Sequence, residues 1–102
     1  MNRPLQIFME YKIKDDSVET YEGAMKKVLK ALEENEASDI HWYKAADQGS
    51  LYVEMFKVPT MSHYNEIKEK RRDEQHPVFG HLEKYVDGGL KKVHCWAFIE
   101  KN

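Results

Sequence analysis

Apolar and polar side chains alternate along residues 5–14, with Phe8 as the exception. One side of this stretch is apolar and carries Leu5, Ile7, Met9, Tyr11 and Ile13. The opposite side carries polar residues such as Gln6, Glu10 and Lys12. A period of two residues is typical of a strand with one buried face. The chain is therefore predicted to begin with a half-buried strand.

A helical spacing replaces this alternation after Asp15-Asp16-Ser17. Apolar residues then recur every three or four positions, at Tyr21, Ala24, Met25, Val28, Leu29 and Leu32. Asp16 followed by Glu19 has the form of a capping pair at a helix N-terminus. These features predict a helix over residues 17–35 that packs its apolar side on a sheet.

Two strands joined by a short turn are predicted next. Residues 39–46 and 51–58 are rich in aromatic and β-branched side chains, and residues 47–50 between them are turn formers. Pro59-Thr60 then stops the second of these strands. The pattern is that of a hairpin.

A second helical region follows the hairpin, and its middle is predicted to be broken. Met61, Tyr64 and Ile67 keep helical spacing up to a run of charged residues. Pro77 suits the first position of a renewed helix, and Gly88-Gly89 ends it. We expect the break near residues 73–76.

The last predicted strand, residues 91–100, is largely apolar on both sides: Cys95 and Ala97 alternate with Trp96 and Phe98. One side must face the helices, and for so short a chain the simplest cover for the other side is a second copy of the sheet. The sequence thus predicts one domain, residues 1–102, of the α+β class. Its expected fold is ferredoxin-like, in β-α-β-β-α-β order with an antiparallel four-stranded sheet, and its expected partner is itself, in a homodimer formed through the sheets.

Charge and composition remove several classes of partner. With 16 Lys and Arg against 18 Asp and Glu, the net charge is −2, so a nucleic-acid partner is not expected. The run 68–74 is mixed in sign and is interpreted as a solvated helix face. The N-terminus lacks the apolar core of a signal peptide, and nothing approaches the roughly 20 apolar residues of a membrane span. We therefore expect a cytoplasmic protein with no membrane association.

Few residues belong to a recognisable chemical motif. Cys95 lies mid-strand among apolar neighbours and is interpreted as a packing thiol. The five histidines show no zinc-binding spacing, so no metal site is expected. His76, beside Pro77, is either a helix-start residue or a base or ligand at the helix break. Glu10 and Glu54 could face each other on neighbouring strands, or pair with nearby lysines.

Aromatic residues make up 12% of the chain and occur in every predicted element. They could simply fill a small core and a dimer interface. They could also line an apolar cleft that holds an electron-rich aromatic ligand, with tyrosine hydroxyls to orient it. Both interpretations stay open.

Residues 51–64 form an apolar strand that runs into a helix beginning with small polar residues and carrying Tyr64. Together with the order of elements, this stretch resembles the dimeric α+β barrel superfamily, and in particular its antibiotic biosynthesis monooxygenase type. The resemblance implies a fold used by small oxygenases that bind an aromatic or haem-like ligand between sheet and helices. Its haem-degrading members combine a first-strand Asn, a second-helix Trp and a haem-ligating His. Near those places stand Tyr11, then Tyr64 or Asn65, and then His76.

The predicted site is a cleft between the sheet and the second helix, lined by Tyr11, Trp42, Tyr64, His76 and Phe79. In a cofactor-independent monooxygenase, Tyr11 and Tyr64 would orient a small aromatic ligand, His76 would take a proton, and Trp42 and Phe79 would hold the ring. No cofactor is expected. A non-enzymatic ligand-binding or stress-response barrel would use the same cleft without turnover, and a haem-binding or haem-degrading relative is a further alternative.

Overall fold

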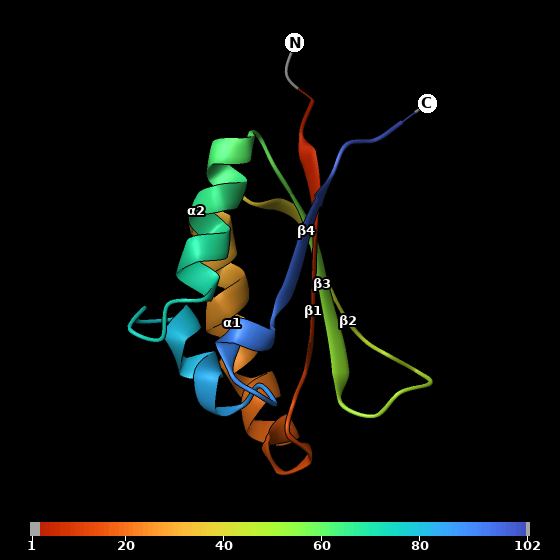
Figure 1. Cartoon of the computed structure of the whole chain (residues 1–102), viewed down its shortest axis with the longest axis vertical. Helices are drawn as coiled ribbons and strands as arrows, with labels where there is room; N and C mark the ends of the chain where they lie inside the picture. The colour runs from red at the N-terminus through yellow and green to blue at the C-terminus, as the bar shows by residue number, and fades with distance from the viewer. Residues whose placement is uncertain (1–2, 102) are drawn as a thin grey trace.

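A computed structural model describes residues 3–101 as one sheet covered on one face by helices (Figure 1). The main elements are, in chain order, β1 (Leu5–Lys12), α1 (Val18–Glu34), β2 (Ser38–Lys44), β3 (Leu51–Val58), α2 (Met61–Arg71) and β4 (His94–Phe98). Short 3-10 helices lie between them: η1 (Asp15–Ser17), η2 (Phe79–Lys84) and η3 (Leu90–Lys92). This is the predicted β-α-β-β-α-β order.

The sheet has the strand order β2-β3-β1-β4, and every neighbouring pair is antiparallel. β1 and β3 therefore lie in the centre, and Met9 of β1 is paired with Glu54 on one side and Cys95 on the other. Pairing of β2 with β3 is irregular between Ser38 and His41. The predicted four-stranded antiparallel sheet is confirmed.

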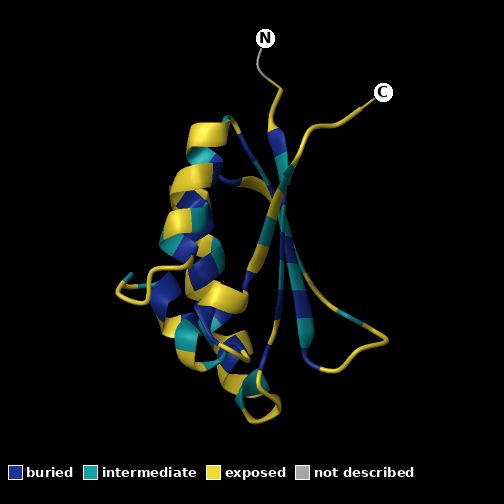
Figure 2. Ribbon diagram, viewed as in Figure 1, coloured by how far each residue is buried: buried dark blue, intermediate teal, exposed yellow. Residues whose placement is uncertain are grey.

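The two faces of the sheet have different surroundings. The face toward the helices carries the alternate side chains that are buried, among them Ile7, Met9, Tyr11, Tyr52 and Phe56. In Figure 2 the helices lie on one side of the sheet only, and their buried residues are turned toward it. Within residues 3–101 no element covers the opposite face, where Trp96 and Phe98 remain 43% and 50% exposed. Large apolar side chains in this position define an open outer face.

Both α-helices pack through a stripe at helical spacing. α1 buries Tyr21, Met25, Val28 and Leu32, as the sequence predicts. α2 is capped by Thr60, whose hydroxyl oxygen accepts from the backbone N–H of His63 at 3.3 Å. No helix within residues 3–101 combines the length and apolar character that crossing a membrane requires.

Several local expectations need correction. Asp16 does not cap α1: it lies in η1, and the first residue before α1, Ser17, makes no side-chain cap hydrogen bond. The renewed helix after Pro77 is the short 3-10 helix η2 rather than an α-helix, and it ends at Lys84, before Gly88-Gly89. The predicted break before it is confirmed. β4 covers only residues 94–98 of the predicted 91–100, because η3 takes up the preceding residues.

Candidate functional site

A buried ion pair joins the sheet to the second helix. Arg71 donates from Nη1 to Glu54 Oε1 at 2.6 Å and from Nη2 to Glu54 Oε2 at 2.8 Å. Both side chains are fully excluded from solvent. Because removing two charges from water costs several kcal/mol for each ion, this fork-shaped pair is an expensive feature for so small a core.

The backbone explains why these two charges point inward. Glu54 follows Tyr52 and precedes Phe56 in the alternation of β3, so its side chain faces the helices. Arg71 is the last residue of α2 and continues the buried stripe of Tyr64 and Ile67. The interpretation of residues 68–74 as a solvated helix face is therefore wrong for Arg71.

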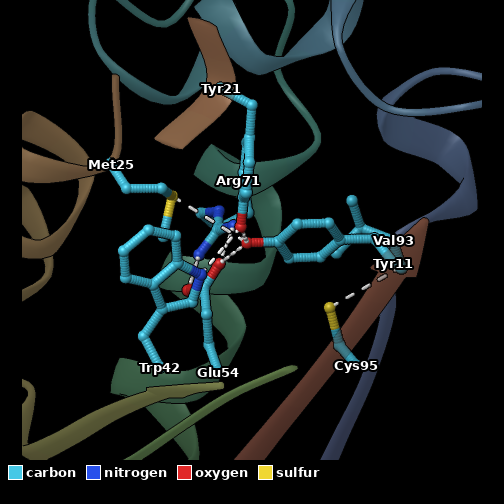
Figure 3. Close-up of polar contacts among 8 residues, drawn as sticks. All are labelled: Tyr11, Tyr21, Met25, Trp42, Glu54, Arg71, Val93 and Cys95. Carbon is cyan, nitrogen blue, oxygen red and sulfur yellow. Dashed lines mark hydrogen bonds and ion pairs between the residues drawn. The ribbon is translucent and has the colours of Figure 1, made fainter. Parts of the chain in front are cut away.

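A chain of hydrogen bonds runs outward from Glu54 (Figure 3). The Tyr11 hydroxyl donates to Glu54 Oε2, and it lies 2.5 Å from the Tyr21 hydroxyl. Trp42 Nε1 donates to the Tyr21 oxygen at 2.9 Å. With one proton on each hydroxyl, the donors run in a single direction from Trp42 through Tyr21 and Tyr11 to Glu54. We call Trp42, Tyr21, Tyr11, Glu54 and Arg71 the buried polar chain.

Burial sets the protonation of this chain. It raises the pKa of Tyr11 well above its ordinary value, and the Glu54 carboxylate raises it further. Burial and then Glu54 raise the pKa of Tyr21 in the same way. For Arg71, burial opposes the charged form, but the neighbouring carboxylate outweighs it and the pKa is raised. At neutral pH the two phenols are therefore hydrogen-bond donors and not bases.

The far end of the polar chain is bordered by aromatic rings. The Arg71 guanidinium lies over the Phe79 ring, 5.2 Å from its centroid, and the Phe79 ring is stacked on His76 at 4.6 Å. Among the described residues, Arg71 Nε has no hydrogen-bond partner although it is fully buried. The guanidinium is thus held by the Glu54 carboxylate and by the Phe79 ring.

His76 starts the turn that leads into η2. Its Nδ1 accepts from the backbone N–H groups of Val78 and Phe79, both at 3.1 Å. Burial, with the Lys70 charge as a smaller cause, lowers the pKa of His76, which favours this neutral acceptor. The helix-start interpretation of His76 thus has a direct structural basis, and Nε2 is the nitrogen left for any other role.

The five predicted site residues are brought together only in part. Tyr11 and Trp42 both belong to the polar chain, and Phe79 and His76 border it through stacking. Tyr64 is buried on α2, and burial raises its pKa, but no hydrogen bond within residues 3–101 connects it to the chain. The space around Tyr11 and Phe79 is filled by packed side chains, since both are almost fully buried.

Sequence reasoning missed Tyr21, Glu54 and Arg71 as site residues. The suggestion that Glu10 and Glu54 face each other is wrong, because Glu10 is paired with Val53 and lies on the outer face. The signals were present: Glu54 is in phase with the buried residues of β3, and Arg71 lies four residues after Ile67. Among residues 3–101 no three His, Cys, Asp or Glu side chains are grouped so as to hold a metal ion.

Solved structures with the same arrangement come from several organisms. A conserved protein from Methanosarcina mazei is 14% identical, with a TM-score of 0.73 over 96% of this chain and 93% of its own. A candidate antibiotic biosynthesis monooxygenase from Bacteroides thetaiotaomicron is 11% identical, with a TM-score of 0.61 over 98% and 90%. A dabb family protein with a ferredoxin-like fold from Mesorhizobium loti is 8% identical, with a TM-score of 0.53 over 98% and 100%.

These neighbours define the class of fold. The chain has a ferredoxin-like fold, and its structural neighbours include the type of protein that residues 51–64 resemble. No protein-family model matches the chain, and no curated protein matches its sequence. The likeness is one of fold, because identities of 8–14% carry no residue roles.

Proposed function

We propose that the domain binds a small aromatic compound at the outer end of the buried polar chain. The observation that carries this proposal is the position of Trp42. Its indole donates to the Tyr21 hydroxyl and is stacked on the Tyr52 ring, with centroids 6.1 Å apart at an interplanar angle of 22°. Trp42 is only half-buried and lies on the edge strand β2. Turning this indole outward would leave a flat, aromatic-walled space with one polar group at its end.

The contacts of Trp42 indicate what kind of ligand could take the place of its indole. A planar ring with one N–H or O–H group could stack on Tyr52 and donate to the Tyr21 oxygen as the indole does. The ion pair behind Tyr21 holds Tyr11 in place, so the polar end of the site is formed before a ligand arrives. The cost of burying the ion pair would then serve recognition as well as structure.

The test is a titration of the purified protein with 2-naphthol. Tryptophan emission reports on Trp42 when it is recorded in a Trp96→Phe background, which leaves one tryptophan. We expect saturable quenching, and a loss of affinity of about 5- to 10-fold in Tyr21→Phe, because one hydrogen bond is removed. Tyr43→Phe is the control, since Tyr43 is an exposed tyrosine of the same strand. Equal affinity in Tyr21→Phe and Tyr43→Phe would contradict the proposed site.

A second candidate function is oxidation of the bound compound by dioxygen without a cofactor. It is favoured by the fold, which the chain shares with a candidate antibiotic biosynthesis monooxygenase. In the balanced reaction an activated ring CH2 group and O2 give a ring carbonyl and water, so that the substrate supplies all four electrons. Tyr11 and Tyr64 would orient the substrate, and His76 would take the proton at Nε2 if the substrate reaches the Phe79 end.

Oxygen uptake distinguishes these two functions. Anthrone carries the required CH2 group, and an oxygen electrode would record its consumption of dioxygen with and without the protein. Enzyme-dependent uptake that falls in Tyr11→Phe, with release of anthraquinone, supports the oxygenase. Saturable naphthol binding without any acceleration of uptake supports a binding protein without turnover.

The outer face of the sheet supports the homodimer as part of the same proposal. Phe8 packs edge-on against Trp96, with ring centroids 5.5 Å apart, and His94 is stacked on Trp96 at 5.9 Å. Under two-fold symmetry this exposed apolar row would meet the same row of a second copy. Light scattering should give twice 12.1 kDa. Trp96→Glu should give a monomer, whereas Met61→Glu, at an exposed apolar residue of the helical layer, should stay dimeric.

A further inference from the structure

A groove lies between α1 and the segment 77–85. It encloses about 350 Å³, which is at the lower end of the range for small-molecule sites. One wall is the face of α1 that carries Thr20, Gly23, Ala24 and Lys27, at positions three and four apart. The other wall comes from the turn before η2 and from η2 itself. No residue of the buried polar chain lines this groove.

Gly23 forms the floor of the groove, and the fold does not require a glycine there. It lies inside α1 with a helical backbone, and a Cβ built on it would meet no atom within 4 Å. A glycine in a helix interior lowers helix stability relative to alanine. A glycine at this position is explained if a ligand occupies the space next to it. The missing side chain leaves a depression next to Ala24, into which a flat molecule could settle.

The groove has one sign of charge. The side chains around its rim are Lys27, Thr20 and His81, and none of the residues that line it is acidic. A second cation stands close by, because Lys84 Nζ lies 5.2 Å from the centroid of the Tyr85 ring, which forms part of the wall. The remaining lining residues are small or apolar: Gly23, Ala24, Pro77, Val78 and the ring of Tyr85. An apolar floor with cationic and hydroxyl donors on its rim fits a flat anion.

We propose that this groove binds a small aromatic carboxylate. The ring would lie on Gly23 and Ala24 against Val78, and the carboxylate would meet Lys27, with Thr20 and His81 as further donors. This site is separate from the naphthol site proposed at Trp42, and it stands whether or not that site is occupied. It gives the domain a second ligand class, an organic acid, on a surface that the proposed sheet-to-sheet homodimer would leave exposed.

The test uses 1-naphthoate as the probe and 1-naphthalenemethanol as its neutral counterpart. Amide chemical shifts of the 15N-labelled protein locate the binding, and calorimetry measures it. We expect saturable binding of the acid at millimolar or lower concentration, with the largest shifts along residues 20–27 and 77–85. The alcohol should bind about 5- to 10-fold more weakly, since it lacks the charge.

Two variants and a matched control separate this groove from other surfaces. Gly23→Leu places a side chain in the groove from a position where the Cβ meets no atom within 4 Å, and it should reduce affinity at least about 10-fold. Lys27→Gln should abolish the preference for the acid, whereas Lys30→Gln, an exposed lysine of the same helix outside the groove, should keep it. Circular dichroism verifies that each variant is folded.

Three results would overturn the proposal: unchanged affinity in Gly23→Leu, equal effects of the two lysine substitutions, or no saturable binding of 1-naphthoate by the wild type. Shifts centred on Tyr21 and Trp42 would also reject the groove, and would place the acid at the site proposed for the neutral ligand. Failure of naphthol binding alone would leave the groove unaffected.

Discussion

Breaking the Glu54–Arg71 pair should be the most damaging change that one substitution can make in this core. Arg71→Met removes the guanidinium and leaves the Glu54 carboxylate fully buried, with the Tyr11 hydroxyl as its remaining donor. A buried charge deprived of its partner costs about 3–5 kcal/mol. The free energy of unfolding of such a domain is about 5–15 kcal/mol in total, so this loss is a large part of it.

The double variant Glu54→Leu with Arg71→Met should behave differently. It removes both charges, and a buried pair exchanged for apolar residues is often neutral in stability. Tyr11 then loses its carboxylate acceptor but keeps the Tyr21 hydroxyl at 2.5 Å, so about 1 kcal/mol is the expected residual cost. The coupling free energy between the two residues should therefore exceed about 3 kcal/mol.

Urea denaturation of the wild type, Glu54→Leu, Arg71→Met and the double variant, all at one fixed concentration, measures this cycle. Arg71→Met should lower the urea midpoint by at least about 1 M, and the double variant should recover most of that loss. A fixed concentration matters because self-association adds to apparent stability. A cost below about 1 kcal/mol for Arg71→Met, or a double variant as unstable as the sum of the two single variants, would refute a fully desolvated pair.

Four further predictions concern stability. Gly23→Ala should raise the free energy of unfolding by about 0.5–1 kcal/mol in thermal or urea melts, since nothing contacts the new methyl group. His76→Ala should cost about 1 kcal/mol through its lost backbone caps. Because the pKa of His76 is lowered in the fold, wild-type stability should also fall as pH drops below about 6.5, with a smaller slope in His76→Ala. Burial raises the pKa of Tyr52 to about 12, so the unfolded chain ionises first, and urea melts should show stability declining between pH 10 and 12, less so in Tyr52→Phe.

The fold was predictable because most of its information is local. The alternation in residues 5–14 identifies the buried face of β1 directly, and the stripe from Tyr21 to Leu32 identifies the buried face of α1. Both sides of β4 are apolar in sequence, which predicts an apolar outer face that the helices do not cover. In the structure Trp96 and Phe98 are exposed on that face. The boundaries were less predictable. η2 and η3 are held by turns and by contacts such as Glu83 Oε1 accepting from the Leu90 N–H, which depend on tertiary structure.

The site was harder to predict because its partners are far apart along the chain. Tyr11 and Trp42 were identified as aromatic residues of central interest, but their connection through Tyr21 depends on how α1 lies across β2 and β1. Arg71 was not recognised as buried because the residues next to it in sequence are charged. Its direction is set instead by its place in the buried stripe of α2, after Tyr64 and Ile67. Sequence reasoning can look for such a buried ion pair. Its signal is a charged residue that continues the buried stripe of a helix, together with an opposite charge in phase with the buried residues of a strand.

The buried pair also bears on strand register. A shift of β3 by one residue relative to β1 would turn Tyr52, Glu54 and Phe56 to the outer face and bring Val53 and Met55 inward. Both alternatives are apolar enough to pack, so hydrophobicity alone discriminates weakly between them. The shifted register, however, would leave Arg71 buried without its carboxylate, at about the same cost of 3–5 kcal/mol. We therefore expect the double variant to regain stability but to populate more than one register of β3. This would be seen as extra or broadened amide signals from β3. A single sharp set of signals from the double variant would show that packing alone selects the register.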